Sequence, residues 1–157
     1  MDIYVKLDGI TGESKDAKHK GWIDVLTISY DVSQSSSMNT GGGGGVGRAD
    51  FTPVTFGHHV DRASPALFKY CAAGKHIPKV EISACKAGGG AQEALRITLG
   101  DVLVTNVSPR GAAGALWTES VSLSYSTISI DVKEQKADGS MSAGGVGAWD
   151  IKQNKEC

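Results

Sequence analysis

The feature that most constrains the fold is a polar segment of about twenty residues, 31–50, which follows a predicted strand at residues 22–30. The segment consists largely of Ser, Asn, Thr and Gly, and five consecutive glycines occupy 41–45. It shows neither the period of a strand nor that of a helix. Loops this long are uncommon in a compact domain unless they serve a function. We therefore predict a protruding loop over 31–50 that a partner orders.

Alternating apolar and polar residues around this loop predict a mainly β fold. The segments with this alternation are 3–7, 80–85, 95–99 and 121–125. A period of two is typical of strands with one buried face. The apolar phase slips at Ser126 and Thr127, which predicts a bulge or strong bend of the kind a closing barrel needs. We expect one domain over residues 1–157, a small closed antiparallel β-barrel with one flanking α-helix and the long loop.

One helix is predicted over about 64–73. Ser64 is a suitable N-cap, a proline follows at the first helical position, and Gly74 suits the C-terminal stop. Apolar residues spaced four apart form a stripe that can cover one side of a barrel. The pairs with this spacing are Leu67 with Cys71 and Phe68 with Ala72.

Composition excludes several classes of function. A hydrophobic fraction of 40% and a charged fraction of 21% are ordinary for a globular chain. A net charge of −1 and a pI near 6.4 give no sign of nucleic-acid binding. No apolar run reaches the roughly 18 residues of a membrane span, so membrane insertion is not expected. The N-terminus has no Sec-type signal pattern, which predicts cytoplasmic synthesis and, if the protein leaves the cell, export without Sec.

The glycine run matches a dinucleotide-binding fingerprint only formally. Residues 42–47 read G-x-G-x-x-G, but that motif needs a strand that turns directly into a helix. The residues from Arg48 to Pro53 do not open a helix. A P-loop is excluded too, because Arg48 and Ala49 stand where Lys and Ser or Thr are needed.

Metal and enzyme chemistry are also weakly signalled. The residues that could be imagined as a zinc site are His58, His59, Cys71, His76 and Cys85. Zinc motifs bring ligand pairs two to four residues apart, whereas adjacent histidines on a strand point to opposite faces. The chain has no G-x-S-x-G nucleophile elbow and no paired carboxylates that stand out. We expect no catalytic residue, no metal, no cofactor and no enzyme activity.

Two predicted strands suggest assembly. The strand 120–131 is apolar on one face and almost entirely Ser and Thr on the other, which fits a face covered by a neighbour or lining a neutral channel. The strand 22–30 is apolar on both faces, and a small barrel buries only its inside, so its outer face is expected to meet another chain. The residues assigned to a subunit interface or barrel core are Trp22, Leu26, Ile28, Tyr30, Trp149 and Ile151. Thr27 and Ser29 are predicted to face a channel and bind cargo.

A series of short motifs spans nearly the whole chain. They are GESKD at 12–16, His19, IDVL at 23–26, SQS at 33–35, the glycine run, SPAL at 64–67, GKH at 74–76, KAGG at 86–89, QKADG at 135–139 and WDIKQN at 149–154. As an ordered set they resemble the Hcp family (haemolysin-coregulated protein), the tube subunit of the bacterial type VI secretion system.

The resemblance implies a defined assembly. In the family, six copies of a small β-barrel form a ring, and rings stack into a tube related to phage tail tubes. The tube lies in a contractile sheath, carries a spike protein, is secreted by the type VI system without Sec, and carries small effectors in its lumen. The long loop supplies the stacking contact. Its residues here are Ser35, Met38, Asn39, Thr40, Gly41, Gly42, Gly43, Gly44, Gly45, Val46 and Gly47.

A hypothesis from another class is a monomeric ligand- or carbohydrate-binding β-barrel. It predicts a concave site lined by exposed aromatic residues, for which the chain offers Trp22, Trp117, Trp149 and a few Tyr and Phe. The molecular mass of the native protein discriminates between the two hypotheses.

Overall fold

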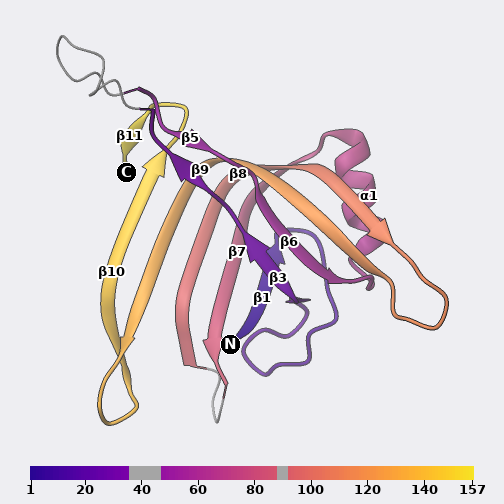
Figure 1. Cartoon of the computed structure of the whole chain (residues 1–157), viewed down its shortest axis with the longest axis horizontal. Coiled ribbons are helices and arrows are strands. Elements are labelled where there is room, and N and C mark those ends of the chain that lie inside the picture. Colours follow the sequence, from indigo (N-terminus) through magenta and orange to yellow (C-terminus); the bar gives the residue numbers. More distant parts are fainter. Residues whose placement is uncertain (36–46, 88–91) are drawn as a thin grey trace.

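The computed structural model describes residues 1–35, 47–87 and 92–157. These residues form strands and one helix (Figure 1). In chain order they are β1 (Asp2–Leu7), β2 (Ile23–Val25), β3 (Thr27–Ser29), β4 (Val32–Ser33), β5 (Asp50–Phe51), β6 (Val54–His59), α1 (Ser64–Ala73), β7 (His76–Lys86), β8 (Gln92–Arg110), β9 (Thr118–Gln135), β10 (Met141–Asp150) and β11 (Lys155–Glu156). Within the described ranges, no helix is long and apolar enough to cross a membrane.

The main sheet is antiparallel and is built around three long strands. Its order is β11-β10-β9-β8-β7-β1-β2, and β7, β8, β9 and β10 run side by side in a curved layer (Figure 1). β8 pairs along nearly the whole of β9, whereas the other edge of β9 is shared. β6 pairs with the first part of β9 and β10 with the second part, and β3 adds to β6. The mainly β fold with one short helix is as predicted.

The closed barrel is not confirmed, because the hydrogen-bonded order of the sheet is an open path. The segment 22–30, predicted as one strand, is two strands of three residues each. β2 pairs with β1, whereas β3 pairs with β6. The change of partner occurs at Leu26, whose backbone N–H donates to the carbonyl of Gly57 at 2.8 Å. Since each short strand pairs with a different neighbour, no continuous ladder of the described residues closes the sheet.

The hydrophobic core lies on one face of this sheet and draws on strands far apart in sequence. Val5 of β1, Phe56 of β6, Leu99 of β8 and Leu123 of β9 are fully buried in it. Helix α1 adds Leu67, which is also fully buried, and packs against β8. Each such side chain contributes about 1.5–3 kcal/mol by leaving water. The core therefore joins the helix to the centre of the sheet.

The helix has the predicted bounds, and Gly74 ends it in the left-handed conformation, at φ 61°. The predicted N-cap is wrong. Ala63 is the cap residue and has no side chain that can cap the helix, while Ser64 lies inside the helix. The Ser64 hydroxyl instead accepts the backbone N–H of Asp61, and the Asp61 carboxylate accepts that of Ala63 at 2.8 Å. Asp61 therefore closes the turn that leads into α1.

The predicted change of apolar phase in β9 is confirmed, and it is shared by three neighbouring strands. The buried residues on either side of the change are Ile77 and Val80 in β7, Leu99 and Val102 in β8, and Leu123 and Ile128 in β9. Gly100 pairs with Lys79 on one side and Thr127 on the other, so the three changes lie side by side. The register of β8 and β9 is not interrupted there but shifts between Val104 and Asn106. The strands thus bend together without a bulge at that point.

Candidate functional site

The ends of the predicted loop are structured, contrary to the expectation for 31–50. Val32 pairs with Phe51 in the β4–β5 ladder, and Asp31 and Thr52 exchange hydrogen bonds of 2.7 and 2.9 Å. We call residues 31–35 and 47–52 the loop base. Of the predicted stacking residues, Ser35 and Gly47 belong to the loop base. The others, Met38, Asn39, Thr40, 41–45 and Val46, lie outside the described residues.

The loop base is fastened to the body of the protein at two points. The Arg48 guanidinium donates to the carbonyl of Ile151 and, at 3.3 Å, to that of Lys152, in the turn between β10 and β11. On the other side, the Tyr125 hydroxyl of β9 donates to the carbonyl of Thr52 at 2.9 Å. Burial raises the pKa of Tyr125 to about 12, so this donor keeps its proton at physiological pH.

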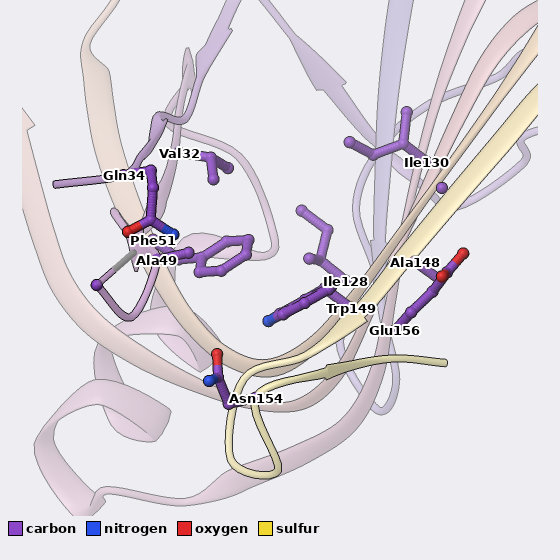
Figure 2. Close-up of a pocket in the computed structure, with 12 residues that line it drawn as sticks. Val32, Gln34, Ala49, Phe51, Ile128, Ile130, Ala148, Trp149, Asn154 and Glu156 are labelled. Atoms are coloured by element: carbon purple, nitrogen blue, oxygen red, sulfur yellow. The ribbon is translucent and has the colours of Figure 1, made fainter. Parts of the chain in front are cut away.

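An apolar cavity of about 530 Å³ lies between the loop base and the outer sheet. Val32 and Phe51 line it from the loop base, and Ile128, Ile130 and Trp149 line it from β9 and β10 (Figure 2). Cavities of this size with mostly apolar walls can accept apolar groups of a ligand or partner. Trp149, predicted as interface or core, packs against the core and forms one wall of this cavity.

The predicted faces of the segment 22–30 are partly wrong, because the chain changes its pairing partner at Leu26. Alternation along a single strand would place Leu26 on the same face as Ile28 and Tyr30, yet 53% of its surface is exposed. Ile28 and Tyr30 pack against the core, and Ile23 is buried in it. The alternation therefore inverts between β2 and β3. Leu26 is left as an apolar residue facing outward.

The predicted cargo residues Thr27 and Ser29 are both exposed on β3 and line a cavity of about 330 Å³. The hydroxyl side chains that share this cavity are Thr27, Ser29, Thr55, Ser108, Thr118 and Ser120. We call this surface the hydroxyl face. Sequence analysis missed Arg110, which lines it as well and supplies a positive charge. The surface can offer many neutral hydrogen-bonding groups to a bound chain.

A buried ionic group lies at the floor of the hydroxyl face. His58 is fully buried, and its Nε2 lies 2.8 Å from Oε1 of Glu119. Its Nδ1 lies 3.7 Å from Oδ2 of Asp61. Burial alone lowers the pKa of His58, but the nearby carboxylate of Asp61 and the hydrogen-bonded carboxylate of Glu119 outweigh it and raise the pKa above its ordinary value of 6.5. In the sequence His58 stands out only as one of five conceivable zinc ligands, and its contacts with Asp61 and Glu119 are not predicted.

The other candidate metal ligands do not converge. His59 and His76 are exposed, and Cys71 packs at the edge of the core. Across the described residues, no three His, Cys, Asp or Glu side chains are arranged to hold a metal ion.

A serine, a histidine and an aspartate do come together at another place. Asp16 Oδ2 lies 2.7 Å from Nδ1 of His19, and Nε2 of His19 lies 3.1 Å from Oγ of Ser83. The order matches that of a hydrolase triad. However, Ser83 is fully buried and donates its proton to Glu93 at 2.6 Å. Because the hydroxyl is neither accessible nor free to transfer its proton to His19, the group ties the segment before β2 to β7 and β8.

The outer strand β10 presents an open edge. Among the described strands, only β9 pairs with residues 141–147, because β11 reaches no further than Trp149 and Asp150. We call 141–147 the β10 edge. Val146 on this strand is 72% exposed, and Val132 beside it is 47% exposed. Unpaired apolar edges are ready templates for another chain. Leu26 is exposed near the opposite end of the sheet path.

These surfaces belong to a known type of protein. A family model described as "Type VI secretion system effector, Hcp" matches residues 4–132. The chain is a member of the Hcp family. It is 42% identical to Protein hcp1 of Pseudomonas aeruginosa, over 98% of this chain and 97% of that protein.

Solved structures of Hcp proteins agree with this assignment. The fold matches Hcp1 from Salmonella typhimurium with a TM-score of 0.81 at 39% identity, over 99% of this chain and 98% of that one. It matches another type six secretion system protein with a TM-score of 0.94 at 27% identity, over 99% of both chains. The Hcp resemblance found in the sequence motifs is thus confirmed, and with it the link to type VI secretion. The ligand- or carbohydrate-binding module is not favoured, since these relatives are Hcp and secretion-system proteins.

Proposed function

We propose that this Hcp protein is the tube subunit of a type VI secretion system, and that six copies associate head to tail into a ring. The observation that carries the proposal is the β10 edge with its exposed Val146 at one end of the sheet path. The exposed Leu26, near the other end, is the surface that the edge of the next copy contacts. Two different patches that meet in this way form a heterologous interface, which closes into a ring when the rotation between copies allows it.

Native mass spectrometry of the purified protein tests this assembly. We expect a main species with six times the chain mass of 16.3 kDa at micromolar concentration. A protein that stays monomeric under these conditions contradicts the ring and favours the monomeric binding module.

The loop carries the contact between rings in this proposal. Arg48 and Tyr125 fix the loop base to the body of the protein, which gives the loop a defined point of departure toward the next ring. The apolar cavity beside the loop base offers a place for apolar groups of the next ring. The sheath, the spike and small effectors are the further partners, and secretion by the type VI system is the route of export.

Shortening residues 40–47 is expected to leave folded rings that no longer stack. Loop-closure entropy depends only weakly on length, so the free energy of unfolding should change by less than about 1 kcal/mol. Electron microscopy of concentrated protein checks for tubes, and native mass checks for rings. If the shortened protein still forms tubes, the stacking contact lies elsewhere; if it forms no rings, the loop serves the ring itself.

Cargo is proposed to bind the hydroxyl face. Replacing Ser29 by Gln puts a larger side chain over Thr27 and Thr55, and should weaken retention of an effector at least tenfold while the ring stays intact. Ser33→Gln, on the exposed strand β4, is the matched control and should retain the effector. Co-purification of a tagged effector gives the readout. Equal retention by both variants would remove the cargo role from this surface, and a monomeric Ser29→Gln would instead place Ser29 in the ring interface.

A further inference from the structure

His58 connects three parts of the fold through one buried ring. It belongs to β6, its Nε2 contacts Glu119 of β9 at 2.8 Å, and its Nδ1 faces Asp61 in the turn before α1. Only 8% of the Asp61 side chain and 4% of the Glu119 side chain are exposed. We call these three residues the His58 clasp. Because all three are buried, water cannot replace their contacts with one another.

The two contacts of the imidazole differ in kind. The contact to Glu119 is a short hydrogen bond, whereas 3.7 Å between Nδ1 and Asp61 is an ion-pair distance. Within the described part of the chain, Nδ1 of His58 is the buried side-chain nitrogen or oxygen without a hydrogen bond. A buried polar atom in this position costs free energy unless charge holds it. The attraction between the ring and Asp61 therefore depends on the ring carrying its second proton.

The contact of Asp61 with His58 also affects the start of helix α1. Its other carboxylate oxygen accepts the backbone N–H of Ala63 at 2.8 Å, and Ala63 is the cap residue of α1. Since Ala63 offers no capping side chain, the Asp61 carboxylate supplies a side-chain acceptor at the entry to the helix, beside the hydrogen bond from the Asp61 backbone N–H to the Ser64 hydroxyl. A change in the position of Asp61 therefore alters the first turn of α1.

Few other charges bear on the clasp. Arg110 at the end of β8 lines the cavity above it and supplies a positive charge. β3, on the far side of β6, has no charged residue. The adjacent His59 is exposed, and the ring of Phe56 packs 5.6 Å from that of His58. His58 is therefore the group of the clasp that can change its charge near neutral pH.

We propose that the His58 clasp is a proton-dependent switch that fastens the turn 60–63 and the start of α1 to the β6–β9 ladder. With the ring doubly protonated, one N–H donates to Glu119 and the positive charge offsets both carboxylates. When the ring releases one proton to solvent, two buried carboxylates face a neutral imidazole. The turn then opens, and water reaches Asp61. The switch acts within one chain and does not depend on ring assembly.

The direction of the pH dependence follows from the raised pKa of His58. In the unfolded chain His58 titrates near 6.5, so the clasp contributes its full stability below that pH. The contribution is lost as the pH rises above 6.5 and through the pKa of the folded protein. Release of one proton changes the opening equilibrium by up to about tenfold per pH unit.

Hydrogen exchange on the intact protein between pH 6 and 9 tests the switch. After correction for intrinsic rates, the hydrogen-bonded amides of Ala63, Ser64 and Leu67 should lose protection as the pH rises, by up to about tenfold per pH unit. Amides in the centre of β8 should keep their protection. His59→Gln, which changes the exposed neighbour, should show the same loss. In His58→Gln, whose side chain does not titrate, the protection of these amides should not change with pH. Protection of the Ala63, Ser64 and Leu67 amides that does not vary with pH in the wild type overturns the proposal.

A second measurement tests the proposed switch if His58→Gln does not fold. The His58 imidazole of the wild type, followed by nuclear magnetic resonance, should titrate above 6.5, and in Glu119→Gln it should titrate at lower pH because one carboxylate charge is gone. Titration of wild-type His58 at or below 6.5, or a midpoint that does not move in Glu119→Gln, overturns the proposal.

Discussion

Replacing Val146 by lysine is expected to convert the ring into separate chains of 16.3 kDa. Val146 is 72% exposed on the β10 edge, so the substitution should leave the fold of the single chain unchanged. In the proposed interface the lysine would be buried without a partner, at a cost of several kcal/mol for each of the contacts around the ring. A lysine on an edge strand also opposes pairing with a second chain. Native mass at micromolar concentration gives the readout.

Val60→Lys is the matched control for this experiment. Val60 is also an exposed valine, at 41%, but it follows β6 and lies on neither of the two proposed contact surfaces. We expect Val60→Lys to remain a ring. If both variants dissociate, charge in general rather than the β10 edge destabilises the assembly. If both remain rings, the β10 edge is not the interface.

A mixing experiment reports on the geometry of the contact. Leu26→Lys should also be monomeric, because Leu26 is proposed to lie on the surface that receives the β10 edge. When the two variants are mixed, the intact β10 edge of one can bind the intact Leu26 surface of the other. We expect one-to-one dimers that do not grow further, because the remaining surfaces both carry lysine. Dimers within either variant alone would indicate a symmetric contact in place of a head-to-tail one.

Replacing Phe56 by alanine is expected to be the most damaging single change within the chain. Phe56 is fully buried between β3 and β9, and truncation of a buried phenylalanine costs about 3–5 kcal/mol. Natural domains have about 5–15 kcal/mol of stability in total, so this is a large share of it. Urea unfolding measures the loss. The measurement is best made in the Val146→Lys background, because assembly adds stability that depends on concentration.

Phe68→Ala serves as the control for this truncation. Phe68 lies on the outer face of α1 and is 67% exposed, so its removal should change the free energy of unfolding by less than about 0.5 kcal/mol. Similar losses for the two variants would mean that the core does not contain Phe56 as described.

The strands could be predicted from the sequence because burial of one face imposes a local period of two, as in β1, where Val5 and Leu7 are buried. The end of the helix could also be predicted from the local sequence, since Gly74 adopts a left-handed conformation that other residues avoid. The break at Leu26 could not be predicted in this way. It depends on which strands the chain meets in space, and β1 and β6 are distant from each other in sequence.

The same limit applies to the polar groups of the candidate site. Thr27 and Ser29 are exposed at one cavity, and their cargo role stays a prediction. The pairs His58 with Glu119 and His19 with Ser83 are 61 and 64 residues apart in sequence, so no spacing rule links them. The histidines can be read from the sequence, but the residues that they contact cannot. Only the ladder between β6 and β9 places Glu119 opposite His58.

The coordinated bend of β7, β8 and β9 restricts how this sequence can diverge. At Lys79, Gly100 and Thr127 the three strands exchange their inward and outward sides together. A relative that gained or lost one residue in a single strand would present its apolar side chains to water beyond that point, and its neighbours could not follow. Changes of length should therefore accumulate in the hairpins at 111–117 and 136–140, where the chain turns outside the ladder. Across an alignment of relatives, gaps within these three strands should be absent or should occur in all of them at once.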